Sequence, residues 1–130
     1  MTLYDSSVLI EYLDGADVAV EYVEAHLDER AVTPQLTMFE VYQGEVFKSG
    51  PADFDAVDGA LGWVTVLDGD GDVARSAAKL QNELHRQGEV LAARDAFIAG
   101  AARAHDERLA VADSDFDVAG LTNLVDVDFL

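Results

Sequence analysis

The sequence lacks several features that mark large classes of protein. It has no cysteine, which excludes disulfide bonds and thiolate metal sites. No apolar run approaches the roughly 18 residues of a membrane-spanning helix, and the N-terminus does not resemble a signal peptide. The motifs G-x-x-x-x-G-K-[ST], G-x-S-x-G and H-E-x-x-H do not occur. We therefore expect a soluble, cytoplasmic protein without these nucleotide-binding, serine-nucleophile or zinc motifs.

Basic residues are also scarce. The chain has 26 acidic and 8 basic residues, which gives a formal net charge of -18. Self-repulsion at this charge weakens the compact state in dilute buffer, whereas at ~1 M salt the screening length falls to about 3 Å. The composition resembles the surface of proteins from extreme halophiles. We therefore treat most carboxylates as solvated surface groups and look for the few that break this pattern.

The arrangement of apolar residues predicts one α/β domain that spans residues 1–130. Short strands are expected at 2–5, 31–33, 62–68, 108–113 and within 122–130, and the apolar run 62–68 predicts a buried strand. Helices are expected at 6–15, 16–30, 37–50, 52–61, 71–88 and 92–107. Short apolar strands separated by helices predict a mostly parallel sheet of about five strands with helices on both faces.

Two acidic residues follow predicted strands directly. Asp5 ends the first strand, and Asp113 ends the run "RLAVAD" with Asp115 two residues later. Ligands of open parallel sheets bind outside the carboxyl ends of the strands. Asp5 and Asp113 are therefore candidates for a shared binding site at this edge.

Two further acidic residues lie on helices that are otherwise apolar. Asp95 is in the first turn of its predicted helix and shares a face with Ile98, Ala99 and Ala102. Glu40 stands in the apolar stretch 38–42. Both carboxylates are expected to be carried inward, toward the same rim of the sheet as Asp5 and Asp113.

Each of these carboxylates also has an alternative interpretation that needs no ligand. Asp5 is a favoured helix N-cap residue, and Thr37 with Glu40 matches a capping box. Asp95 suits the positive end of its helix dipole, and the stretch 113–115 has the composition of a turn. The residues taken one at a time leave both interpretations open. The common location of all four favours a shared site.

A cluster of four carboxylates needs a counter-charge. Two unit charges about 4 Å apart repel by roughly 4 kcal/mol at an effective dielectric constant near 20, and a domain of this size has only about 5–15 kcal/mol of net stability. Mg²⁺ and Mn²⁺ prefer oxygen ligands and are the obvious partners. One or two such ions suit the hydrolysis of a phosphodiester bond.

Four stretches of the sequence resemble a known family. The stretches "LYDSSVLIEYL", "LTMFEVYQG", "GEVLAARDAFIAGAARAHDERLAVADSDF" and "LTNLVDVDF" are similar to the PIN domain, and in particular to VapC-type toxins of toxin–antitoxin systems. The resemblance implies a PIN-like α/β/α sandwich and a Mg²⁺- or Mn²⁺-dependent ribonuclease that cuts structured RNA such as tRNA or rRNA. It also implies a homodimer that is neutralised by a cognate antitoxin protein.

The resemblance carries roles to individual residues. It implies a catalytic quartet of Asp5, Glu40, Asp95 and Asp113. It also implies metal ligands at Asp5, Asp95, Asp113 and Asp115. Ser7 matches a small polar position that often hydrogen-bonds one of the carboxylates. We add Arg94, beside Asp95, as a candidate contact to the RNA phosphate. The chain departs from the pattern "T-x-D-x-D-F" at Val111, which removes one polar contact near the site.

Three other classes of protein are alternatives to a VapC-type toxin. A response-regulator receiver has a similar sheet, but it needs an acidic pair after the first strand and a lysine near the last. This chain has one acid in "YDSS" and no lysine after Lys79. A PIN nuclease of RNA processing and a catalytically silent PIN-fold binding protein both stay open.

Overall fold

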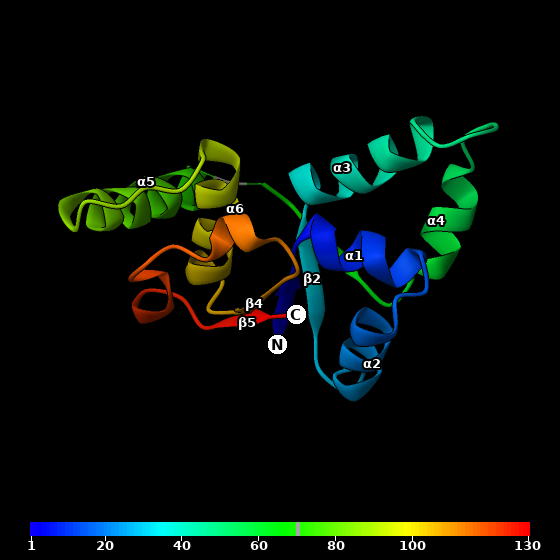
Figure 1. The fold of residues 1–130 in the computed structure, drawn as a ribbon, viewed down its shortest axis with the longest axis horizontal. Coiled ribbons are helices and arrows are strands. Elements are labelled where there is room, and N and C mark those ends of the chain that lie inside the picture. The colour runs from blue at the N-terminus through cyan, green and yellow to red at the C-terminus, as the bar shows by residue number, and fades with distance from the viewer. Residues whose placement is uncertain (70) are drawn as a thin grey trace.

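The structure is a computed structural model that describes residues 1–69 and 71–130. Five short strands form one sheet (Figure 1) in the order β3-β2-β1-β4-β5, and all neighbouring strands are parallel. The strands are β1 (Thr2–Tyr4), β2 (Ala31–Pro34), β3 (Thr65–Leu67), β4 (Arg108–Val111) and β5 (Val127–Phe129). The expected α/β fold with a parallel sheet of about five strands is confirmed.

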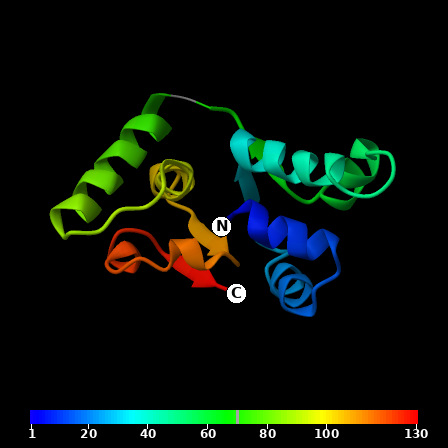
Figure 2. The same ribbon diagram turned by 45° about the horizontal axis from the view of Figure 1, so that its top comes forward.

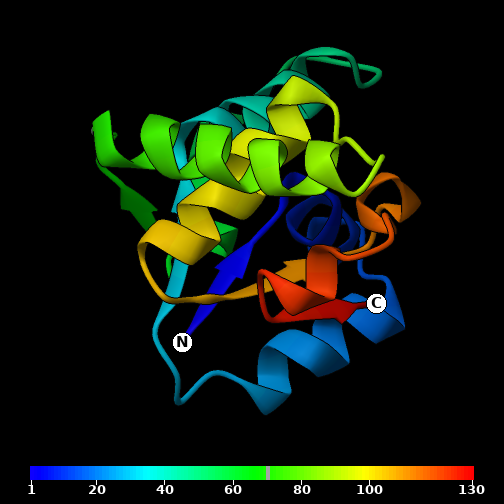
Figure 3. The same cartoon turned by 90° about the vertical axis from the view of Figure 1, so that its left-hand side faces the viewer.

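Six α-helices within the described residues enclose this sheet. They are α1 (Ser6–Leu13), α2 (Asp17–Ala25), α3 (Gln35–Val46), α4 (Phe54–Ala60), α5 (Gly71–Arg86) and α6 (Ala93–Ala104). Two short 3-10 helices, η1 (Ser114–Phe116) and η2 (Leu121–Asn123), precede β5. Figures 1 and 2 show α1 to α4 on one side of the strands and α5 and α6 on the other. Figure 3 views the molecule from the second side, with α5 nearest the viewer and α6 behind it.

Alternation along the central strands produces two hydrophobic clusters, one on each face of the sheet. In β1, Leu3 belongs to the cluster beneath α5 and α6, whereas Tyr4 belongs to the cluster beneath α1 to α4. In β4, Leu109 lies on the first side and Ala110 on the second. Successive side chains of a strand point to opposite faces, so these apolar strands require helices on both sides.

Helices α5 and α6 pack closely against each other at Gly100. The apolar face predicted for α5 is buried, and Ala77 lies at its centre. Gly100 of α6 stands so close to it that a Cβ atom at position 100 would lie 2.4 Å from the Cα atom of Ala77. The absence of a side chain at Gly100 therefore fixes the distance between the two helices. The position of α6 matters because its first turn carries Arg94 and Asp95.

Two local predictions are wrong. Helix α3 begins at Gln35, and its N-cap residue is Pro34 without a side-chain hydrogen bond. Thr37, where the sequence predicted the helix to begin, therefore lies inside the helix, and the alternative interpretation of Thr37 and Glu40 as a capping box is wrong. Thr65 and Val66 of β3 are exposed, although the run 62–68 predicted a buried strand. The reason is that β3 pairs with β2 alone and stands at the edge of the sheet. In the part of the chain described here, no helix is long and apolar enough to cross a membrane.

Candidate active site

Asp5 connects the end of β1 to the start of α1. Its backbone N–H donates to the carbonyl of Ala110 in β4 (3.0 Å), which holds the residue at the carboxyl edge of the sheet. Its side chain is the N-cap of α1, because Oδ2 accepts hydrogen bonds from the Ser7 N–H (3.2 Å) and the Ser7 Oγ (2.6 Å). The other oxygen, Oδ1, points toward Arg94. Asp5 thus serves both roles: Oδ2 caps helix α1, and Oδ1 takes part in the site.

Ser7 joins three segments of this edge. Besides donating to Asp5, its Oγ accepts a hydrogen bond from the N–H of Ala112 (3.0 Å), which directly follows β4. The hydroxyl therefore fixes both the orientation of the Asp5 carboxylate and the path of the chain toward Asp113. This is the contact that the sequence assigned to Ser7.

We expect Ser7→Ala to lower the free energy of unfolding by about 1–3 kcal/mol, since the N–H of Ala112 and the Asp5 carboxylate both lose a partly buried partner. Urea unfolding at constant high salt measures this loss. Ser49→Ala, at an exposed position, removes the same hydroxyl without a buried partner and is the control. Equal stability of the two variants would show that the Ser7 bridge contributes nothing.

The guanidinium of Arg94 is the centre of the site. Its Nη2 lies 2.8 Å from Asp5 Oδ1 and 2.6 Å from Glu40 Oε1, and its Nη1 lies 2.5 Å from Asp95 Oδ1. Its Nε donates to Glu40 Oε2 (2.7 Å), so the pair with Glu40 is bidentate. Nη2 also donates to the Oγ of Ser6 (2.8 Å). Carboxylates from α3, from α6 and from the β1–α1 junction therefore converge on one cation.

Asp113 belongs to the same electrostatic environment. Burial raises the pKa of Asp95, and the charges of Asp5 and Asp113 raise it further, whereas Arg94 offsets only part of this increase. Burial alone would lower the pKa of Arg94, but the hydrogen bonds with Glu40, Asp95 and Asp5 and the charge of Asp5 outweigh it, so the pKa is raised. Arg94 thus compensates the burial of Asp95 only in part.

The last acidic pair lies at the outer side of this cluster. Asp113 is half-buried and is the N-cap of η1, with its Oδ1 accepting a hydrogen bond from the N–H of Asp115 (2.9 Å). Asp115 is exposed, and its backbone N–H supports Asp113. The side chain of Val111 is fully buried in the cluster beneath α5 and α6, so this position contributes packing where the family pattern has a hydroxyl.

The carboxylate oxygens suit a hard divalent ion, but in the structure they surround the guanidinium of Arg94. Carboxylate oxygens are the ligands that Mg²⁺ and Mn²⁺ prefer, and three of them face one positive group. Within residues 1–69 and 71–130, no three His, Cys, Asp or Glu side chains are placed to hold a metal ion together. Arg94 stands between them. These carboxylates therefore provide the ligand atoms that a divalent ion prefers, and Arg94 is their counter-ion in the structure.

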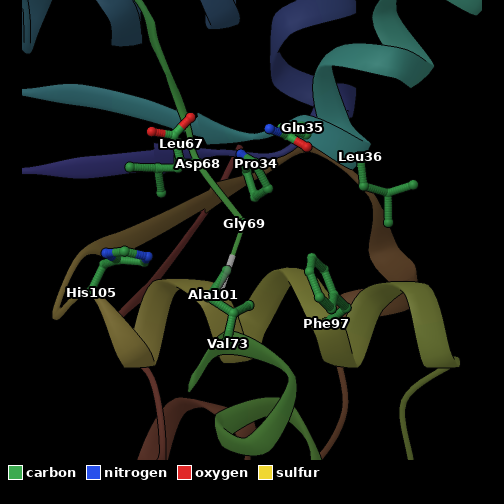
Figure 4. A pocket seen from close by; sticks show the side chains of 10 residues that line it. All are labelled: Pro34, Gln35, Leu36, Leu67, Asp68, Gly69, Val73, Phe97, Ala101 and His105. Carbon is green, nitrogen blue, oxygen red and sulfur yellow. The ribbon is translucent and has the colours of Figure 1, made fainter. Parts of the chain in front are cut away.

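A mostly apolar pocket of about 210 Å³ lies at the carboxyl ends of β2 and β3 (Figure 4). It lies between α6 and the ends of β2 and β3, with Phe97 and Leu36 at one end and His105 at the other. Leu36 is one turn before Glu40 on α3, and Phe97 is one turn after Arg94 on α6. The pocket therefore reaches the helical turns next to those that carry Glu40 and Arg94.

The sequence predicted the positions of the carboxylates better than it predicted their partners. It placed Asp5, Glu40, Asp95 and Asp113 on one rim, and the structure brings the first three onto Arg94 and the fourth close enough to act on Asp95. Ser6 was missed, although an Oγ beside a helix N-cap is a common polar contact. The proposed role of Arg94 at a phosphate was based on its position, and here its donors are directed at carboxylates.

Comparisons with known proteins agree with this fold. The sequence model of one protein family, described as "PIN domain", matches residues 2–121. No curated protein sequence matches the chain. Similar solved structures include the DNA-bound VapBC of Salmonella typhimurium, with 18% identity, a TM-score of 0.79, and coverage of 98% of this chain and 96% of that chain.

Two other solved structures are similar over nearly the full length of both chains. A toxin–antitoxin complex from Klebsiella pneumoniae has 23% identity and a TM-score of 0.76, and the match covers 98% of this chain and 96% of that chain. VapBC-5 from Mycobacterium tuberculosis, a member of the VapBC family of toxin–antitoxin systems, has 26% identity and a TM-score of 0.65, with coverage of 99% and 96%.

Proposed function

Because this chain belongs to the PIN domain family, we propose that it is a metal-dependent endoribonuclease and, more narrowly, the toxin of a VapC-type toxin–antitoxin pair. One observation carries the proposal. The carboxylates of Asp5, Glu40 and Asp95 come from distant parts of the chain and converge on a single cation at the carboxyl edge of the sheet. Such a pocket suits the binding of a divalent ion and a phosphodiester.

We assign the following roles to the residues of the site. When bound, Mg²⁺ or Mn²⁺ supplies Lewis acidity and neutralises charge at the phosphodiester. Asp5, Asp95 and Asp113 would hold the ion, and Asp115 is an additional ligand at the exposed side. Ser7 keeps one Asp5 oxygen turned away from the pocket and thereby directs the other one into it. Glu40, which is half-buried on α3, would accept a proton from the attacking water.

We propose structured RNA, such as tRNA or rRNA, as the substrate. A protein with a net charge of -18 gains little from general attraction to a polyanion, and the counterion-release contribution fades further as salt rises. Substrate must therefore be recognised by shape and by contacts at the site. The apolar pocket lined by Phe97 and Leu36, each one helical turn from a residue of the site, offers such contacts to a base next to the scissile phosphate.

The proposed partner is a cognate antitoxin protein. The similar structures named above come from VapBC and other toxin–antitoxin complexes. On this chain, an exposed groove of about 520 Å³ between α3 and α4 is lined by Phe39, Val46, Phe47 and Phe54. Exposed apolar patches of this kind mark binding surfaces, and the acidic surface favours a basic partner. We also propose a homodimer, in keeping with the family.

The proposal is tested with purified protein and total RNA from the cells that carry it, in high salt, with added Mn²⁺ or with a chelator. We expect discrete cleavage products in the presence of Mn²⁺ and their loss in the presence of the chelator. Cleavage that resists the chelator would contradict metal dependence. Intact RNA in both samples, from folded protein, would favour a binding protein that does not cleave.

A further inference from the structure

We propose that Arg94 competes with the divalent ion for the carboxylate pocket, so that the pocket holds either the guanidinium or the metal. In the structure Arg94 is the internal counter-ion of Asp5, Glu40 and Asp95. When metal enters, the guanidinium leaves and stays at the rim of the pocket. This inference rests on the proposed metal site and adds a residue that sets its affinity.

The competition follows from individual oxygen atoms. Asp5 Oδ2 is engaged by both groups of Ser7 as the cap of α1, which leaves Oδ1 for the pocket. Asp5 Oδ1 is the atom that Arg94 Nη2 contacts at 2.8 Å. A metal ion held by Asp5 must therefore take Oδ1 from Arg94, because the cap and the fold of α1 require the other oxygen. The same Nη2 atom contacts Glu40 Oε1 (2.6 Å), so Asp5 and Glu40 would be released together.

Charge favours the exchange. Asp5, Glu40, Asp95 and Asp113 carry up to four negative charges at this rim, against one positive charge on Arg94. A divalent ion supplies twice the charge of the guanidinium at the same place. The carboxylates, which Arg94 now separates, are then free to approach the ion.

The position of Arg94 on its helix allows it to leave without unfolding. It is the second residue of α6, and its side chain is 29% exposed, whereas that of Asp5 is 1% exposed. A long side chain anchored beside the pocket reaches the rim by changing rotamers. There, the guanidinium presents its donors to a phosphate held at the same site. The ion pairs seen here and the phosphate contact suggested by the sequence are thus two positions of one side chain.

The inference is tested by measuring Mn²⁺ binding to metal-free protein by titration calorimetry, without RNA. An open state populated at about 1–10% weakens the apparent affinity by the inverse of that fraction. Arg94→Gln is therefore expected to bind Mn²⁺ about 10- to 100-fold more tightly than wild type. Arg94→Lys keeps the charge without the fork and should fall between the two. In thermal unfolding, Arg94→Gln should also gain more stability from Mn²⁺ than wild type does.

The matched control is Arg103→Gln. It lies on the same helix and changes the net charge by the same amount, but Arg103 pairs with Glu83 of α5, outside the pocket. Equal Mn²⁺ affinities for Arg94→Gln and Arg103→Gln would overturn the inference and leave the proposed nuclease intact. Absence of Mn²⁺ binding by every variant would overturn both. Tighter binding by Arg94→Gln together with wild-type protein that does not cleave RNA would uphold the competition and reject the nuclease.

Discussion

Asp95→Asn is expected to reduce RNA cleavage by about 10²–10³-fold, the loss that follows removal of one preorganised electrostatic group from an active site. The substitution keeps the shape of the side chain and removes its charge from the pocket. Asp95 is buried in the first turn of α6, and its Oδ1 contacts Arg94. Gel analysis of RNA products at fixed Mn²⁺ and salt measures the effect.

The fold should survive this substitution. The raised pKa of Asp95 means that its ionised form is disfavoured in the folded protein relative to the unfolded chain. A neutral amide therefore removes an unfavourable charge, and we expect no large loss in the free energy of unfolding of metal-free protein. Asp117→Asn makes the same chemical change at an exposed position and is the control. Near-wild-type cleavage by folded Asp95→Asn protein would remove Asp95 from the reaction.

Gly100→Ala is expected to destabilise the protein by about 1–3 kcal/mol, the usual cost of inserting a methyl group into a fully packed contact. The new Cβ would lie 2.4 Å from the Cα atom and 2.6 Å from the N atom of Ala77. Both are backbone atoms of α5, so one helix must shift. Helix propensity opposes this loss with a gain of up to about 1 kcal/mol, and the clash outweighs it. Thermal or urea unfolding at constant high salt measures the change.

Gly59→Ala is expected to have the opposite effect on stability. Gly59 is also helical, in α4, but a Cβ atom there would have no neighbour within 4 Å. We expect it to stabilise the protein by up to about 1 kcal/mol through helix propensity alone. Gly100→Ala should also lower cleavage, because a shift of α6 moves Arg94 and Asp95 relative to Asp5. Equal stability of the two variants would show that α5 and α6 do not pack as closely as described.

The edge of the sheet on which the carboxylates gather was predictable because it depends on topology. Parallel strands end at a common edge, so Asp5 and Asp113 needed only the correct strand ends to be placed together. The inward position of Asp95 followed from the apolar face that it shares with Ile98 and Ala102. Position along an element and the side of that element are properties that spacing encodes.

The contacts of Arg94 were not predictable in the same way. Arg94 and Asp95 are adjacent on a helix, and adjacent residues do not face each other there. Nothing in the spacing indicates that both side chains turn into one pocket. The start of α3 at Gln35 and the exposure of β3 also depend on information outside the local pattern: Pro34 still belongs to β2, and β3 has only one neighbouring strand.

The two roles of the Asp5 oxygens affect which substitutions inactivate the proposed toxin without destabilising it. A cell that survives release of an active nuclease must carry an inactive copy, and lesions at different positions should leave different products behind. Loss of Asp5 removes the N-cap of α1, which costs about 0.5–2 kcal/mol, so such survivors should contain less of the protein. Replacement of Glu40, on the half-buried face of α3, leaves that cap in place. On the proposed toxin function, survivors altered at position 40 should therefore accumulate full-length, inert protein.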